Sequence, residues 1–361
     1  MSYLWYWPAG GWDFQAWKAD HAWEPITSPQ SGRWDLQPPA SRETTLEAWL
    51  AAREDWLQVV RELLGVVTDT PPESPRWEIL EEYAERGYDR CRVRYALTDS
   101  EWGYAWLLTP RPANGPRPAV IALHQTVPQG KDEPVGLEGD PQLAYGKELA
   151  ERGFVVLAPD AIAFGERLGR HPHAYYRSAE AFFQAHPQGS VMAKMIFDVQ
   201  RAVGYLQSLP EVDGAKIGCI GHSHGAYGSL FAMLFEPRLQ AGVLSCGFTT
   251  LRTDPTPQRW WRNTALIPRL GFYEDCIEQT PFDFHHLLAL VAPRPMMVVA
   301  GLRDPIFPNT ANMPAVLSHA RRIYRLYGAQ ANLHRWIFDG PHAFPPAARP
   351  RAYRLLEQQL P

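Results

Sequence analysis

The sequence has little of several features that define whole classes of protein. It contains four cysteines, none of them in a CxxC pair, and its formal net charge is only −4. So weak a field does not attract nucleic acid or an anionic membrane. No apolar stretch reaches the roughly 18 residues that a bilayer-spanning helix needs, and no internal repeat is visible at the period of a solenoid. We therefore expect neither a nucleic-acid partner nor a membrane partner.

The cysteines and the first residues indicate a compartment. Cys219 and Cys246 lie in apolar runs that are typical of buried strands, which favours reduced, packed thiols over a disulfide. Residues 1–8 show no cationic stretch followed by an apolar core, so they do not resemble a secretory signal. Together these observations predict a cytoplasmic protein.

Tryptophan is abundant and unevenly placed, since more than half of the 14 tryptophans precede residue 57. Exposing so much aromatic surface is unfavourable, so we expect this segment to pack on the main body or on another subunit of a homo-oligomer. Thr44 and Glu47 are spaced as a capping box for a helix that Gly65 would end. The sequence thus predicts a Trp-rich helical extension over residues 1–80 and a main domain over 81–361.

After a predicted hairpin at 90–108, apolar strands and amphipathic helices alternate along the chain. The strands are continuously apolar, which is typical of a parallel sheet covered by helices on both faces, the α/β class. Two long irregular stretches, 161–190 and 248–288, are expected to be lid-like insertions over the carboxyl ends of the strands. Strands are predicted at 119–123, 154–158, 216–220, 242–246, 295–300 and 333–338, and helices at 141–152, 191–209, 224–235 and 311–327.

The motif Gly221-His-Ser223-His-Gly225 lies between a predicted strand and a predicted helix. A serine flanked by glycines at this spacing is typical of a nucleophile elbow, a turn so sharp that side chains at the glycine positions would clash. The following helix points its unpaired N–H groups at the serine and favours negative charge there. The alternative is a glycine-rich turn whose serine only caps the helix, and the flanking strand and helix argue against it.

A serine hydroxyl needs a base that takes its proton and an acid that orients the base. In folds with this elbow, the acid and then the histidine follow later strands. Asp304 follows the strand at 295–300 and His342 follows the last strand, so Ser223, Asp304 and His342 are the predicted catalytic residues. The alternatives are His334, His222, His224, His285 and His286 for the base, and Asp339, Asp283 and Asp160 for the acid.

The tetrahedral intermediate of acyl transfer needs two N–H donors that hold its oxyanion. We expect one from His224, directly after the nucleophile, and the other from the loop after the strand at 119–123. Thr126 is the favoured second donor and Gln125 is the alternative. His124 is expected to brace this loop by hydrogen bonding. The chemistry requires no cofactor.

Several segments match one known group in register: 123–134 (LHQTVPQGKDEP), 151–160 (ERGFVVLAPD), 164–167 (FGER), the elbow, 281–286 (PFDFHH) and 292–295 (APRP). With them the sequence resembles the dienelactone-hydrolase-like and acetyl-xylan-esterase-like bacterial members of the α/β-hydrolase superfamily. The resemblance covers roughly residues 90–350. It implies a mostly parallel, eight-stranded sheet, a Ser–His–Asp triad and hydrolysis of carboxylic esters without a cofactor. Two departures adjoin the nucleophile: dienelactone hydrolases have a cysteine in place of Ser223, and one related group of xylan esterases has Gln in place of His224.

We therefore expect a serine esterase that acts on a small-molecule ester. Trp260, Trp261 and Arg262 are the substrate-binding candidates, because arginine pairs with carboxylates and tryptophan stacks on rings and cations. The alternative is a lid whose aromatic residues close the site. No metal site is predicted, because the two histidines within 169–176 have no further ligands near them in the sequence. Two other functions stay open: a peptidase or amidase with the same triad, and a non-catalytic binding protein of this fold.

Overall fold

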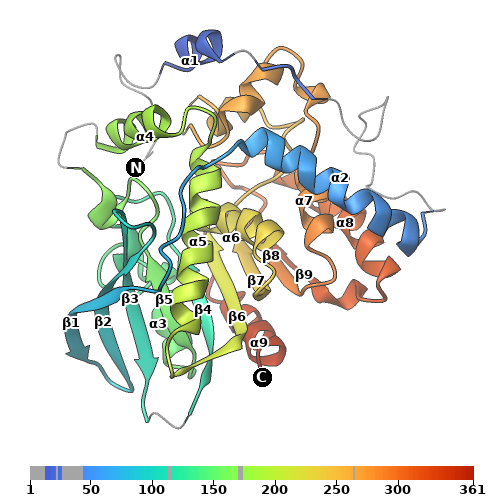
Figure 1. Cartoon of the computed structure of the whole chain (residues 1–361). Coiled ribbons are helices and arrows are strands. Elements are labelled where there is room, and N and C mark those ends of the chain that lie inside the picture. Colours follow the sequence, from blue (N-terminus) through green and yellow to red (C-terminus); the bar gives the residue numbers. More distant parts are fainter. Residues whose placement is uncertain (1–12, 22, 27–43, 113–114, 170–173, 263–264) are drawn as a thin grey trace.

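A nine-stranded sheet forms the centre of the molecule (Figure 1). The computed structural model describes residues 13–21, 23–26, 44–112, 115–169, 174–262 and 265–361, with the backbone alone for 174–179. The strands are β1 (Trp77–Ala84), β2 (Tyr88–Ala96), β3 (Trp102–Pro110), β4 (Arg117–Leu123), β5 (Val155–Pro159), β6 (Val212–His222), β7 (Leu239–Ser245), β8 (Met296–Gly301) and β9 (Leu333–Phe338).

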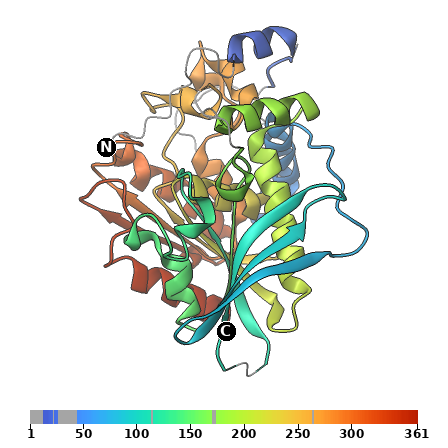
Figure 2. The same cartoon turned by 90° about the vertical axis from the view of Figure 1, so that its left-hand side faces the viewer.

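The strand order is β1-β2-β3-β5-β4-β6-β7-β8-β9. β1, β2 and β3 pair antiparallel with one another, β3 pairs antiparallel with β5, and every pair from β5 to β9 is parallel. Figure 2 shows the antiparallel strands set at a steep angle to the others, as a twisted sheet requires. The predicted α/β fold class is confirmed, with one strand more than the eight expected.

β1 is the strand that the sequence patterns did not reveal. It forms one edge of the sheet, and most of its residues are exposed. A strand without a buried face shows no useful apolar alternation, so the period-two signal is missing. Arg94 binds Glu78 at 2.6 Å and Arg92 binds Glu81, which ties β1 to β2. Because β1 spans residue 80, the sheet begins inside the stretch predicted as a helical extension.

Helices cover both faces of the sheet, as continuously apolar strands predict. One face carries α5 (Val191–Gln207), α6 (His224–Phe235), α7 (Phe284–Val291) and α8 (Met313–Leu326), and α2 (Leu46–Leu64) packs against α7 and α8. The other face carries α3 (Tyr145–Ala150) and α9 (Arg349–Gln359). α1 (Phe14–Asp20) and α4 (Ala174–Ala185) lie at the top of Figure 1. Among the residues described, none of these helices combines the length and the apolarity that crossing a bilayer requires.

The described part of the N-terminal extension packs on the main body. Trp49 and Trp56 of α2 are each 2% exposed, and the Trp56 ring stacks on His286 of α7 with 4.4 Å between centroids. Trp17 of α1 lies against Phe272 of the second insertion. The remaining tryptophans before residue 57, apart from Trp23, lie outside the described residues, and so the homo-oligomer stays a prediction.

The N-cap of α2 differs from the prediction. The helix begins after Thr45, whose hydroxyl accepts the Ala48 N–H at 3.1 Å. The N-cap is therefore Thr45 and not Thr44, and since its N3 residue is Ala48, which has no side-chain acceptor, the prediction of a capping box of Thr44 with Glu47 is wrong. Gly65 ends the helix as expected, with a φ of 71° that favours glycine.

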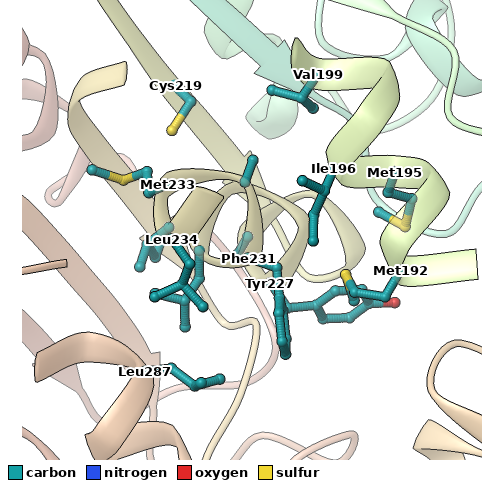
Figure 3. Packing of buried hydrophobic residues seen from close by; sticks show 14 of the residues in the cluster. Met192, Met195, Ile196, Val199, Cys219, Tyr227, Phe231, Met233, Leu234 and Leu287 are labelled. Carbon is teal, nitrogen blue, oxygen red and sulfur yellow. The ribbon is translucent and has the colours of Figure 1, made fainter. Parts of the chain in front are cut away.

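Helix α6, which begins directly after Ser223, is buried along almost its whole length. Its side chains are apolar on all sides, which is typical of a helix enclosed by other elements. α5 and α7 pack against it, and β6 and β7 lie beneath it. Figure 3 shows Met192 of α5 beside Tyr227, with Leu287 of α7 beyond Leu234. This packing fixes the amino end of α6 relative to the sheet.

The two insertions contain more regular structure than the sequence indicated. The stretch 161–190 includes α4, and 248–288 includes three short 3₁₀ helices before the start of α7. The second insertion lies against the elbow helix, since the Trp260 ring is 5.1 Å from the ring of Tyr227. The described part of the second insertion is therefore packed on the elbow helix and is not an open loop.

Truncating the core behind the elbow should destabilise the protein strongly. Phe231 of α6 is fully buried, so Phe231→Ala is expected to lower the free energy of unfolding by about 3–5 kcal/mol. Leu50→Ala is the control, because Leu50 on α2 is 51% exposed and should cost well under 1 kcal/mol. Urea unfolding followed by circular dichroism measures both changes. Equal midpoints for the two variants would contradict this account of the core.

Candidate active site

Ser223 lies at a sharp bend between β6 and α6. Its backbone has φ 53° and ψ −115°, a conformation that costs a non-glycine residue about 1–3 kcal/mol. A Cβ on Gly221 would lie 2.2 Å from the carbonyl carbon of Gly225, and one on Gly225 would lie 2.0 Å from the Leu123 oxygen. Both glycines are therefore required by sterics. The structure has the nucleophile elbow that the motif predicts.

Asp304 and His342 are hydrogen-bonded to each other. His342 Nδ1 lies 2.6 Å from Asp304 Oδ2, and the other carboxylate oxygen accepts the N–H groups of Ile306 and Phe307 at 2.8 and 3.0 Å. The Asp304 side chain is fully buried, whereas that of His342 is 13% exposed. Because the carboxylate accepts only, Nδ1 carries the proton and Nε2 is left as the basic nitrogen.

The elbow and the His342 loop lie side by side. The Ser223 N–H donates to the Ser245 carbonyl at 2.7 Å, and the next residue, Cys246, donates its thiol to the Ala343 carbonyl at 3.4 Å. The rings of His222 and His342 are 4.7 Å apart. Between the described side chains of Ser223 and His342 the structure has no direct hydrogen bond, and such bonds often tighten only when substrate is present.

The other histidines near Ser223 are poor bases. Burial lowers the pKa of His222 well below its usual value, with a further contribution from His342, and His222 Nδ1 is bonded to Ser245 Oγ at 3.0 Å. Burial likewise lowers the pKa of His224 to about 3. His342 is therefore the neighbouring imidazole with both an orienting acid and partial exposure.

The more distant alternatives for the base are placed elsewhere. His334 pairs with Met297 near the start of β8, at the opposite end of the strand from Asp304. His285 and His286 are buried in α7, where His286 Nδ1 accepts the Asp283 N–H at 3.1 Å. None of these three rings lies at the elbow.

The rival acids have structural roles. Asp339 has a side chain that is 76% exposed and pairs with Arg303. Asp283 caps the amino end of α7. Asp160 is buried, and its carboxylate binds Lys131 of the loop after β4. It accepts the backbone N–H of Lys131 at 2.8 Å and the Lys131 Nζ at 2.9 Å. The structure therefore brings only Asp304, of the acids considered, to the histidine at 342.

The loop after β4 lies against the elbow, as the prediction of a second oxyanion donor requires. The Ala161 N–H donates to His124 Nε2 at 3.0 Å, so the proton is on Nδ1, which donates to the Gln125 carbonyl at 2.6 Å. Burial lowers the pKa of His124 and keeps it neutral. His124 thus braces the loop as expected. In a trans peptide the Thr126 N–H points opposite to that carbonyl, away from the His124 ring.

Of the substrate-binding candidates, the two tryptophans are buried and Arg262 is exposed. Trp260 and Trp261 are each 2% exposed, and Trp260 packs between Tyr227 and Phe284, whose ring centroids are 5.1 and 5.2 Å away. Arg262 pairs with Glu274 at 3.5 Å. In this packing the tryptophans do not offer a free face to a substrate, because the core already occupies them. The arrangement fits the alternative, a lid whose aromatic residues close the site.

Two features of the site have no signal in the sequence. Cys246 lies beside Asp304 and His342, although no motif marks it. The Phe307 ring lies 6.1 Å from the His342 ring and 4.8 Å from the Arg259 guanidinium. Both depend on contacts between residues that are far apart in the chain.

Comparison with known proteins agrees with this geometry. The family model described as "Glucuronyl esterase, fungi" matches residues 161–328. The hydrolase YtaP of Bacillus subtilis (strain 168) is 28% identical over 307 residues, which cover 82% of this chain and 96% of YtaP. A glucuronoyl esterase of Solibacter usitatus superimposes with a TM-score of 0.69 at 16% identity over 88% of this chain and 95% of its own. A Bacteroides fragilis structure described as an acetyl xylan esterase gives 0.66 at 16% identity over 86% and 79%.

The chain has the α/β-hydrolase fold. The structural likeness, at such low identity, establishes this fold alone, and the elbow places Ser223 where enzymes of this fold have their nucleophile. The predicted activity class, hydrolysis of carboxylic esters, is confirmed by the family match together with the esterases among the relatives.

Removing the charge of Asp304 should slow catalysis without unfolding the enzyme. Asp304→Asn keeps the shape but favours the wrong imidazole tautomer, so kcat on a p-nitrophenyl ester is expected to fall about ten-thousandfold. Asp339→Asn is the matched control, since Asp339 is exposed and should leave kcat within about twofold. Steady-state kinetics at neutral pH measures both. A larger loss in the Asp339 variant would move the acid to that residue.

Proposed function

We propose that this α/β-hydrolase cleaves carboxylic esters through an acyl-enzyme on Ser223, with His342 as general base and Asp304 as the orienting acid. The supporting observation is the 2.6 Å bond between Asp304 and His342 next to a strained serine elbow. A buried, fully hydrogen-bonded carboxylate keeps the imidazole proton on Nδ1, which leaves Nε2 free to accept the serine proton.

In this mechanism Ser223 Oγ attacks the ester carbonyl carbon while His342 Nε2 takes its proton. The carbonyl oxygen becomes an oxyanion, which the backbone N–H groups of His224 and Thr126 stabilise. His342 then protonates the leaving alcohol, and the acyl group stays on Ser223. A water molecule gives its proton to His342 and attacks the acyl carbon. His342 then returns that proton to Ser223 Oγ as the acid leaves, which restores the free enzyme. Each step needs only the groups named, and no cofactor enters.

For the second oxyanion donor we favour Thr126 over Gln125. The Gln125 carbonyl accepts hydrogen bonds from the Val127 N–H, at 2.9 Å, and from His124 Nδ1. These two bonds fix the plane of the peptide between Gln125 and Thr126. That orientation directs the Thr126 N–H away from the His124 ring. The side chain of Gln125 is bonded to Glu133 at 3.0 Å, which anchors the loop further.

We propose that the ester belongs to a carbohydrate. The family match and a solved neighbour are glucuronoyl esterases, whose names indicate a sugar acid as the acyl group. This is our first candidate. The second candidate is an acetylated sugar, supported by the neighbour described as an acetyl xylan esterase, where the sugar is the alcohol. The two candidates place the sugar on opposite sides of the scissile bond.

Replacing the nucleophile tests the mechanism. Ser223→Ala is expected to lower kcat by about ten-thousandfold or more and to abolish labelling by a fluorophosphonate, because no oxygen remains to be acylated. Ser208→Ala is the matched control, since its hydroxyl only caps the Tyr205 carbonyl. Wild-type activity in the Ser223 variant would refute the acyl-enzyme. Absence of labelling in the wild-type protein would instead favour the non-catalytic binding protein.

A substrate panel separates the remaining functions. Methyl glucuronate, an acetylated xyloside, a p-nitrophenyl ester and its matched anilide differ only in the acyl group, the alcohol or the scissile bond. We expect the highest kcat/KM on the glucuronate ester and at least a hundredfold preference for the ester over the anilide. Preference for the acetylated xyloside would establish the second candidate, and preference for the anilide would establish an amidase.

A further inference from the structure

Cys246 lies against the acid and the base of the proposed triad. Its Sγ, a carboxylate oxygen of Asp304 and a ring nitrogen of His342 all lie within 4.8 Å of one another. The three residues follow the ends of β7, β8 and β9, which are neighbours in the sheet. The Cys246 side chain is 3% exposed, and no step of the mechanism uses it.

We propose that Cys246, Asp304 and His342 form a binding site for a thiophilic divalent cation, Zn²⁺ or Cd²⁺, whose occupancy switches the enzyme off. The inference rests on the proposed function in one respect, that His342 is the general base. The ligand site itself depends only on the geometry of the three side chains.

The donor set suits such an ion. Thiolate, imidazole and carboxylate are the three ligand types that zinc takes in proteins, with Zn–S near 2.3 Å and Zn–N near 2.0 Å. Ligand atoms that share one tetrahedral zinc lie about 3–4 Å apart, so Cys246 Sγ, within 4.8 Å of both partners, needs only a small movement. His342 Nδ1 and Asp304 Oδ2, which are 2.6 Å apart, must open slightly to admit the ion. The fourth position can be filled by water or by the Ala343 carbonyl, to which the thiol already donates at 3.4 Å.

The backbone around the thiol is held in place. Cys246 has a φ of 50°, a left-handed conformation that is unusual for a residue with a side chain. Its N–H donates to the Val299 carbonyl of β8 at 2.9 Å. A residue so fixed keeps its Sγ directed at the Ala343 carbonyl and the adjoining imidazole. The site is therefore preorganised on strand ends, as a metal site of useful affinity requires.

Charge and protons balance in the exchange. The thiol of Cys246 loses its proton to solvent, and the cation is then matched by one thiolate and one carboxylate. The cation replaces the proton shared by His342 Nδ1 and Asp304, so the neutral imidazole carries its proton on Nε2 instead.

The shift of the proton explains the inhibition. With Nε2 protonated, His342 has no lone pair to accept the proton of Ser223, and the nucleophile is not activated. The cation also separates the imidazole from its orienting acid. Inhibition therefore acts on the base and requires no contact between the cation and the substrate.

Cadmium titration tests the site directly, because a cadmium–thiolate bond absorbs in the ultraviolet. The wild-type protein should gain this band and lose ester hydrolysis with the same midpoint, and EDTA should reverse both. Cys246→Ala should keep the basal activity within about twofold, lack the band and need at least tenfold more Cd²⁺ for half inhibition. Cys219→Ala is the control, because Cys219 is equally buried but lies within β6, and it should behave as wild type.

Other variants separate the cation site from the proposed esterase activity. Ser223→Ala should still bind Cd²⁺ with the wild-type band, since Ser223 is not a ligand, and Asp304→Asn should weaken the band. If Cys246→Ala does not fold, Cys246→Ser replaces it, because a hydroxyl is a poor ligand for cadmium.

A wild-type protein without the band at saturating Cd²⁺ overturns the site. A Cys246 variant that is inhibited as strongly as wild type overturns the assignment of Cys246. A protein with the band but no esterase activity keeps the site and refutes the proposed function.

Discussion

The bend at Ser223 is the constraint on which the rest of the site depends, because serine does not adopt φ 53° unless its surroundings leave no alternative. Gly221 and Gly225 lie so close to neighbouring backbone that no side chain fits at either position. The Ser223 N–H is bonded to the end of β7, and α6 is buried behind it. The Ser223 hydroxyl is thus positioned by the core of the protein. Any change that loosens α6 should therefore move the proposed nucleophile.

The ends of three neighbouring parallel strands bring together the acid and the base of the proposed triad and a buried thiol. β7 brings Cys246, β8 brings Asp304 and β9 brings His342 to the same edge of the sheet. Parallel strands place their carboxyl ends together, so residues nearly 100 positions apart in the chain become neighbours. The same convergence has two consequences. It orients the imidazole for the base catalysis that we propose, and it places beside that imidazole ligands that suit a soft cation.

The second insertion is part of the same core. Trp260 contacts Tyr227 of α6, and Arg259 lies over Phe307 beside His342. Trp260 and Trp261, which the sequence indicated as stacking residues for a substrate, are instead buried, and Trp260 fills space between the insertion and the elbow helix. In this packing Trp260 and Trp261 therefore offer no stacking platform to a substrate.

Patterns in consecutive residues predicted much of the fold and of the candidate site. The alternation of apolar strands and helices indicated the α/β fold, and the steric need for glycine at 221 and 225 indicated the elbow, because both depend on local geometry. The order of Asp304 and His342 along the chain then predicted the pair that the structure brings together. Only the tertiary structure decided the edge strand β1, the burial of Trp260 and Trp261, and the position of Cys246. These depend on contacts between distant segments, and such contacts leave no periodic trace in a single sequence.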